Sequence, residues 1–332
     1  MVLFICVIGV FFRFYQLDAT SSADLYAPAL GVLTILGLYL FVSEIFDWHI
    51  AGITSFLLAI SHWHVTISRT ELQATLLPLL LVFTFYFLWR GLRRSELKDF
   101  FCAGVLSGLA FYIPIPYHLS FLVAILLFIN YWFFLKKDYS GTEYIHARNR
   151  LLAGCALFGL VTFFVAVPAL IQFIQNPQSL LSAGNYTIPN IPMFGWPIAL
   201  FCVIGFFKEF GHWISRKHGH FSPVHTLLFS WFFIMLAPQF FKFQAPSALQ
   251  TFAVLPVIII FAGRGIWWIF NVLEEWEMIA QPWKNRGHKQ FIAPVMALFI
   301  LLGALGIYEY NRTFNIWHTE QTLQLQGAPV IR

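Results

Sequence analysis

Charged residues are scarce in this chain: among 332 residues there are 20 Lys and Arg and 15 Asp and Glu. Cysteine is scarcer still, and the four thiols lie inside apolar stretches without the spacing of a disulfide framework or a zinc knuckle. We find no internal repeat, no low-complexity segment and no linker that would divide the chain. These absences leave one continuous apolar domain. The four cysteines are Cys6, Cys102, Cys155 and Cys202.

Apolar residues fill the chain instead: 59% of it is hydrophobic and the mean hydropathy is +0.73. A bilayer core about 30 Å thick needs roughly 20 apolar residues per helix, so the sequence predicts an all-α, polytopic integral membrane protein with about 11 transmembrane helices. The predicted spans are Val2–Phe14, Leu25–Ser43, Ile50–Trp63, Leu72–Leu92, Phe100–Ile113, His118–Leu135, Leu151–Ile174, Gly195–Phe207, Val224–Phe240, Leu249–Phe270 and Phe291–Tyr308.

The cations indicate an orientation, because they concentrate in every second loop. By the positive-inside rule those loops are cytoplasmic, which places the amino terminus inside and the carboxyl terminus outside. The net charge of +5 is then a topology signal with some attraction to membrane lipids, and nucleic acid is not expected as a partner. The cations of these loops are Arg90, Arg93, Arg94, Lys98, Lys136, Lys137, Arg148, Arg150, Lys208, Arg216, Lys217, Lys284, Arg286 and Lys289.

The chain is expected to form a single membrane domain over residues 1–332, with a short extracytoplasmic tail at 309–332. The first apolar stretch lacks a basic leader and a small-residue cleavage site, so we interpret it as a retained span. The general character of the sequence favours the inner membrane of a prokaryotic cell.

The cation-poor outside face carries polar residues that could do chemistry. A carboxylate, a cation and histidines at one membrane surface could deprotonate a hydroxyl and hold a phosphate. Polar residues at helix ends more often only anchor or solvate the interface, and this ordinary reading stays open. The polar residues concerned include Asp18, Asp24, His62, His64, Arg69, Glu71, His118, Lys242, Glu309 and Arg312.

The order of segments resembles a known family. The run FFRFYQLD, the stretch APALGVLTILGLYLFVSEIFDWHIAGITSFLLAISHWHVTISR and the ending FYFLWRGL are similar to ArnT-like and protein-mannosyltransferase-like membrane glycosyltransferases of family 39, in the GT-C superfamily. NIPMFGWPIAL and PSALQTFAVLPVIIIFAGRGIWW look like later parts of the same family. The resemblance implies a GT-C helical bundle. It also implies a transferase that moves a sugar from a polyprenyl-phosphate donor to a lipid, glycan or protein hydroxyl outside.

The family's base is an Asp in the first outside loop, often within an Asp-Glu pair. Here a loop of about nine residues holds only Asp18 and Asp24, which become the candidate bases, although Asp24 could simply cap the following helix. Three explanations remain: loop residues missing from the given sequence, a natural fragment, or a fold that lost its reaction. In the first case the base lies outside these residues.

For the donor phosphate the resemblance favours Arg69, which follows the family's Ser-Arg pattern at an expected helix start. His64 belongs to an aromatic-His pair with Trp63, and Lys242 lies in a later outside loop. Lipid anchoring is the alternative for Arg69, helix capping or packing for His64, and snorkelling for Lys242. A divalent metal could share the phosphate role, but no residues are assigned to it.

Acceptor or sugar contacts are assigned to Glu71, Trp63, Tyr117 and His118. Two other signals are set aside as ordinary. Arg264 is expected to snorkel to headgroups, and a cluster of histidines is expected in a solvated cytoplasmic loop. That cluster comprises His212, His218, His220 and His225.

Two alternative functions remain open. One is a catalytically inactive GT-C scaffold or lipid-carrier binding protein. The other is a transporter of lipid-linked sugar, which would be expected to show paired halves or polar residues near the middle of the bilayer. We see neither feature in the sequence.

Overall fold

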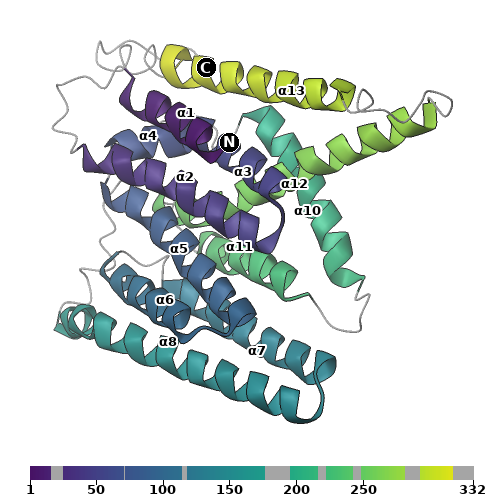
Figure 1. Ribbon diagram of the computed structural model, residues 1–332. Helices are drawn as coiled ribbons and strands as arrows, with labels where there is room; N and C mark the ends of the chain where they lie inside the picture. Colours follow the sequence, from purple (N-terminus) through teal and green to yellow (C-terminus); the bar gives the residue numbers. More distant parts are fainter. Residues whose placement is uncertain are drawn as a thin grey trace.

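Two long helices, α5 (Leu72–Arg94) and α12 (Ala248–Ala280), form the centre of the bundle in the computed structural model (Figure 1). In each, 72% of the apolar membrane-length window is buried inside the protein. Both contain an internal proline, Pro78 and Pro256, which removes one helical hydrogen bond without ending the helix. The structure describes residues 1–15, 25–70, 72–113, 118–175, 195–215, 222–241, 248–280 and 292–316.

The described residues contain helices and no strand, as the apolar runs predict. Each of the eleven predicted spans overlaps a helix, so the all-α polytopic membrane fold is confirmed. The other helices are α1 (Val2–Phe14), α2 (Tyr26–Ile45), α3 (Trp48–Ile60), α4 (His62–Thr70), α6 (Leu97–Leu109), η1 (Ala110–Tyr112), α7 (Ser120–Asp138), α8 (Gly141–Gln175), α10 (Trp196–Ile214), α11 (Pro223–Phe241), α13 (Ile292–Tyr310) and the π-helix η3 (Asn311–Ile316).

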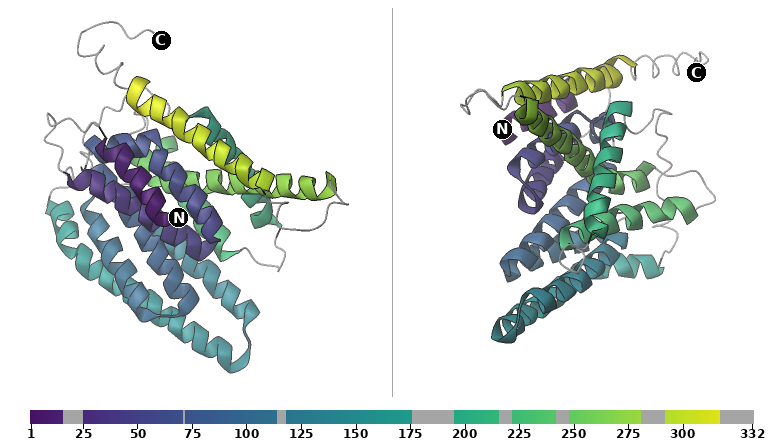
Figure 2. Two further views of the ribbon diagram at one scale, coloured as in Figure 1. Left: turned by 45° about the horizontal axis from the view of Figure 1, so that its top comes forward. Right: turned by 90° about the vertical axis from the view of Figure 1, so that its right-hand side faces the viewer.

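The helices lie in layers around the central pair. Helices α1, α2 and α3 pack on one another, α6 and α8 form a layer beside α5, and α10 crosses α12. Figures 1 and 2 show α13 along the edge of the bundle opposite the α6–α8 layer. The outer helices α8, α10 and α13 expose large apolar side chains such as Phe164, Phe207 and Phe299, which suits contact with lipid chains.

Seven helices in the described part of the chain are long and apolar enough to cross a membrane by length and composition. The bent pair α3 and α4 would add an eighth span, while α1 is shorter than a bilayer crossing normally requires. The count of about eleven crossings, the cytoplasmic amino terminus and the outside carboxyl terminus therefore stay predictions.

Several local expectations were wrong. The predicted third span Ile50–Trp63 ends at Ile60, and the supposed loop after it is helix α4. Nine cations predicted in loops lie in helices: Arg90, Arg93 and Arg94 in α5, Lys98 in α6, Lys136 and Lys137 in α7, Arg148 and Arg150 in α8, and Lys208 in α10. Amphipathic helix continues past the apolar core in these places, which hydropathy alone does not register.

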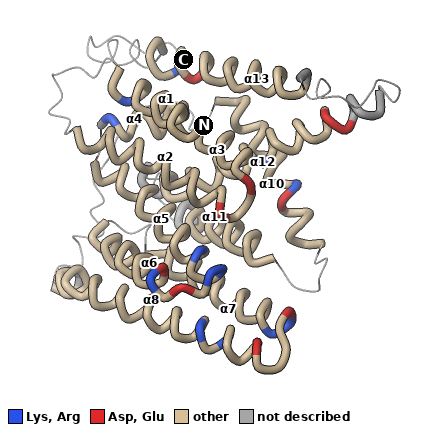
Figure 3. The backbone as a smooth tube through the Cα atoms, viewed as in Figure 1, with Lys and Arg blue, Asp and Glu red and all other residues tan. Residues whose placement is uncertain are grey.

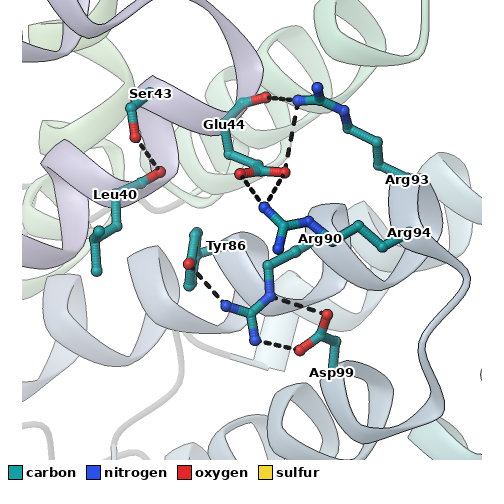
Figure 4. A network of polar contacts seen from close by, with 8 residues as sticks. All are labelled: Leu40, Ser43, Glu44, Tyr86, Arg90, Arg93, Arg94 and Asp99. Atoms are coloured by element: carbon teal, nitrogen blue, oxygen red, sulfur yellow. Dashed lines mark hydrogen bonds and ion pairs between the residues drawn. The ribbon is translucent and has the colours of Figure 1, made fainter.

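Charge is distributed unevenly along the bundle (Figure 3). Helix α5 ends in Arg93 and Arg94, and α7 ends in Lys136 and Lys137. Near the same end, Arg90 bonds the buried Asp99 of α6. Figure 4 shows this network. Cations near helix carboxyl termini are favoured by the helix dipole. The Arg90–Asp99 ion pair also joins α5 to α6 at this end of the bundle.

Candidate functional site

A bend between α3 and α4 creates the candidate site. The two helices meet at an angle of 56°. Ser61 separates them with ψ at 117°, which breaks the helical path, while its amide still donates to Leu57 O at 3.0 Å and its carbonyl accepts from Val65 N at 2.9 Å. The bend turns α4 into the bundle, where His62, His64 and Arg69 are buried.

The amino end of α4 is held by a carboxylate from the far end of the chain. The backbone amide of His62 donates to Glu309 Oε2 at 3.1 Å, and His62 Nδ1 lies 3.2 Å from Thr313 Oγ1. Glu309 is 1% exposed, and its Oε1 lies 3.5 Å from Nη1 of Arg312. An otherwise unpaired amide at a helix amino terminus favours a negative charge, so Glu309 fixes α4 against α13 and η3.

Arg13, in the last turn of α1, is fully buried beside α4. Its Nη1 donates to Gly9 O at 3.0 Å and to Ala59 O at 3.2 Å, and its Nη2 contacts His64 Nδ1. Because a guanidinium can only donate, Nδ1 accepts, and a neutral His64 carries its proton on Nε2. Within the described residues, neither that Nε2 nor Arg13 Nε has a hydrogen-bond partner.

Gly31 of α2 allows these groups to come together. A side-chain carbon at this position would lie 2.6 Å from Ser68 Cβ and 2.7 Å from Arg13 Nε, both closer than packed atoms approach. Ser68 belongs to α4, and its hydroxyl donates back to Val65 O at 2.9 Å. The absence of a side chain on α2 thus lets α1 and α4 meet at the site.

Arg69 lies in the last turn of α4, not at a helix start as the sequence suggested, and is 9% exposed. Its guanidinium carbon stands 5.5 Å from the ring centre of Phe314 in η3, a cation–π contact. Tyr15, which follows α1, packs against the same Phe314 ring at 5.5 Å. Arg13, Arg69 and Arg312 therefore belong to one end of the bundle, where α1, α4 and η3 meet.

The remaining predicted contacts are placed differently. Trp63 is partly buried and stacks on Phe252 of α12, with ring centres 5.4 Å apart. His118, before α7, packs against Phe111 of η1 at 4.7 Å. Trp63 thus belongs to α4 and the candidate site, whereas the contact between His118 and Phe111 lies in the α6–α7 connection.

Five predicted site residues lie outside the described residues: both candidate bases, one cation and two acceptor contacts. Tyr15 is the last described residue before the two candidate bases in the sequence. Its ring packs against Phe314 of the candidate site. The five residues are Asp18, Asp24, Glu71, Tyr117 and Lys242.

The sequence reasoning assigned no role to four members of the cluster. Arg13 was not selected at all, while His62, Glu309 and Arg312 were named only among the polar residues of the outside face. One signal was available, because an arginine inside an otherwise apolar run is costly to bury without a partner. Glu309 and Arg312 carry a second signal: they are spaced i, i+3 and directly follow an apolar run.

The two signals that were set aside also find partners. Arg264 bonds the buried Glu209 through Nε at 2.7 Å and Nη2 at 2.6 Å, so it is ion-paired and not merely snorkelling. His225 Nε2 lies 2.8 Å from the other oxygen of Glu209. His218 and His220 lie outside the described residues. Among the residues that are described, no group of three or more His, Cys, Asp or Glu side chains could hold a metal.

A sequence model of the dolichyl-phosphate-mannose-protein mannosyltransferase family matches residues 11–171, just under half of the chain, which include Arg13, His64 and Arg69. No curated protein sequence matches the chain significantly.

Two crystal structures of the Archaeoglobus fulgidus oligosaccharyltransferase share its fold. One, tethered to an acceptor peptide containing an NVT sequon, has a TM-score of 0.53, 12% identity and 92% coverage of this chain. The other, an apo form, has a TM-score of 0.52, 14% identity and 98% coverage. The chain is therefore similar to the mannosyltransferase family over residues 11–171 and shares the fold of the archaeal enzyme over most of its length. It spans about half of those archaeal proteins, 46% and 50% of their length.

Proposed function

We propose that this protein is a membrane glycosyltransferase of the GT-C superfamily. It would take a sugar from a polyprenyl-phosphate donor on the extracytoplasmic face and pass it to a hydroxyl of a lipid, glycan or protein. The support is the family match over residues 11–171 and the GT-C fold of the whole bundle.

One observation carries the proposal: Arg13 and Arg69 are buried at the same end of an apolar bundle, within the family-matched segment. Burying a guanidinium in an apolar protein is costly unless it meets acceptors or an anion. Arg13 meets two carbonyls and one imidazole, none of which is charged when His64 is neutral. A lipid-linked phosphate would supply the missing negative charge.

The reaction needs a base and a stabilised leaving group. The acceptor oxygen bonds to the anomeric carbon as the bond from that carbon to the phosphate oxygen breaks, with inversion. The acceptor proton passes to a carboxylate, for which we propose Asp24 or Asp18. The released lipid phosphate carries the electron pair and is stabilised by Arg69, with Lys242 as a second cation. Glu309 is not proposed as the base because it caps α4.

The other residues are assigned supporting roles. His64 orients Arg13 through Nδ1 and keeps its Nε2 hydrogen as a donor toward the phosphate. We propose that Trp63, Glu71, Tyr117 and His118 contact the sugar or the acceptor. Among them, Trp63 is held next to α4 by its stacking on Phe252.

The test uses the protein made from its full coding sequence, reconstituted with polyprenyl-phosphate sugars, and measures released polyprenyl phosphate. Arg69→Ala is expected to lower turnover by a factor of about 100 or more, the size of effect seen when one charge-stabilising donor is removed. Arg94→Ala is the matched control. It removes an arginine that is 50% exposed at the carboxyl end of α5, away from the candidate site. Absence of turnover in the unaltered protein would overturn the proposed activity, and equal turnover in Arg69→Ala would overturn the site.

The same preparation separates the alternatives. A scaffold or lipid-carrier binding protein would bind polyprenyl phosphate without releasing sugar. A transporter would move the lipid-linked sugar between leaflets of a vesicle, with the sugar still attached. Each outcome contradicts the transferase proposal by a different measurement.

A further inference from the structure

A pocket lies at the carboxyl end of α5, away from the candidate site. It has a volume of about 530 Å³, within the usual range for pockets that hold small ligands. Its walls come from the carboxyl ends of α5 and α7 and the amino ends of α6 and α8. Because α5, α7 and α8 are long and apolar enough to cross a membrane, we expect the pocket at their ends to lie near the lipid headgroups.

The lining combines cations with an apolar wall. Arg93, His146 and Arg150 contribute nitrogen donors, while Phe100 and Leu151 contribute apolar surface. Within the described residues the Arg150 guanidinium and the His146 ring have no hydrogen bond or ion pair. Arg93 uses only Nη1, which donates to Glu44 O at 2.9 Å and lies 3.5 Å from Glu44 Oε1, so its Nε and Nη2 remain available to a ligand.

Local backbone geometry shapes the pocket between α5 and α6. Ser95, which lines it, has a positive φ of 57°, and this turn reverses the chain between Arg94 and Leu97. Tyr131 of α7 donates its hydroxyl to Leu92 O at 2.9 Å, which ties α7 to the end of α5. The walls are thereby fixed before any ligand binds.

We propose that this pocket binds a phosphate-bearing ligand, and that the ligand is the headgroup of an anionic membrane phospholipid. Two arginines attract the negative charge of a phosphodiester and the ring of His146 adds a hydrogen-bond donor, and basic pockets between membrane helices are suited to such headgroups. The wall of Phe100 and Leu151 suits the glycerol and first acyl carbons, which a free phosphate lacks. The proposal does not depend on the proposed sugar transfer.

One lining residue sharpens the choice of headgroup. Glu143 opens the first turn of α8, on the helix that carries Arg150, and has no partner among the described residues. Its carboxylate repels an anionic headgroup but would attract the ammonium of phosphatidylethanolamine. Replacing it therefore changes the affinity for the two lipids in opposite directions.

The experiment measures lipid retention by the purified full chain in delipidated detergent, using native mass spectrometry with added phosphatidylglycerol. Each lost cation is expected to weaken binding about fivefold, so Arg93→Gln with Arg150→Gln should lose roughly 25-fold. Arg148→Gln, two residues from Arg150 on α8 but outside the pocket lining, is the matched control and should bind as the unaltered protein does.

Two further arms decide the source and the headgroup. Glycerol 1-phosphate in solution should fail to compete with phosphatidylglycerol; arginine-dependent competition would assign the phosphate site to a soluble ligand instead of a lipid. Glu143→Gln should strengthen phosphatidylglycerol binding, a gain that misfolding cannot produce, and a weakening would overturn the anionic assignment. Equal lipid retention by the double arginine variant and the control would overturn the pocket as a phosphate site.

Discussion

The Glu309 carboxylate accepts a hydrogen bond from the backbone amide of His62, 247 residues away, and so joins α13 to α4. A capping group normally comes from the residue just before the helix. Here it comes from α13, because Ser61 and the bend leave the first amide of α4 pointing at that helix. The orientation of α4, and with it the position of Arg69, depends on this contact.

Replacing Glu309 is therefore expected to destabilise the fold. Glu309→Ala should lower the free energy of unfolding by about 1.5–3 kcal/mol, the range for a hydrogen bond to a charged group. Glu309→Gln keeps an oxygen acceptor and should lose less. The midpoints of thermal unfolding in detergent show whether Glu309→Ala loses more stability than Glu309→Gln. Glu96→Gln, at a side chain 40% exposed, serves as the control, and identical midpoints for all three variants would show that the cap contributes nothing.

Gly31→Ala should impair the candidate site more than the fold. The new methyl group would contact Ser68 and the Arg13 guanidinium at under 3.0 Å, so α2 or the arginine has to shift. We expect a destabilisation of about 1–3 kcal/mol and, on the proposed function, a loss of turnover larger than the loss of folded protein. Gly159→Ala is the control, because its methyl group meets no atom within 4 Å. Unchanged turnover in Gly31→Ala would separate the Arg13 position from function.

Gly205→Ala should separate α10 from α12. Its methyl group would stand 1.8 Å from the backbone oxygen of Phe261, and a methyl group added to Gly265 of α12 would stand 2.1 Å from Phe201 O. Backbone atoms cannot rotate away, so the cost should reach or exceed about 3 kcal/mol. Gly211→Ala on α10 meets nothing within 4 Å and should be neutral or slightly stabilising. Thermal unfolding of the pair gives the comparison, and equal midpoints would contradict the close crossing.

Two acidic residues in Figure 4 should differ sharply in their importance. Asp99 is fully buried and bonds Arg90, with Nε to Oδ2 at 2.9 Å. Breaking a buried pair from one side costs about 3–5 kcal/mol. Glu44 pairs with Arg93 and Arg94, whose side chains are 61% and 50% exposed, and such surface pairs contribute about 0–1 kcal/mol.

Unfolding midpoints of Asp99→Asn and Glu44→Gln measure this difference. Both substitutions keep the size and the polarity of the side chain, so each serves as the other's control. A larger loss in the Glu44 variant would mean that exposure does not determine the strength of these ion pairs.

The apolar helices could be predicted because length and hydropathy are local properties of the chain. Helix α4 could not, since its sequence HWHVTISRT is polar and its burial depends on α1, α2 and η3. The Arg13–His64 contact spans 51 residues, and the Glu209–Arg264 pair spans 55. No periodicity records such pairings.

The candidate site was predicted in part. Arg69, His64 and Trp63 were selected from the family resemblance, and the structure places all three on α4. Their functional roles stay predictions, as do those of Asp18 and Asp24. The sequence did not show which residues hold α4 in place, because the contacts of Gly31 with Ser68, of Glu309 with His62 and of Arg13 with His64 join positions far apart in the chain.

The bend at Ser61 also affects how deep in the membrane the proposed site would lie. Helix α3 has 13 residues and is about 20 Å long, which falls short of an acyl layer about 30 Å thick. Arg13 donates to Ala59 O near the end of α3, so on the proposed function it would lie below the headgroup plane, where a lower dielectric constant strengthens its attraction for an anion. The proposed polyprenyl carrier would keep its tail among the acyl chains while its phosphate reached Arg13 from the side. The protein would thus hold a cation within the acyl layer and would not need to draw the lipid into water.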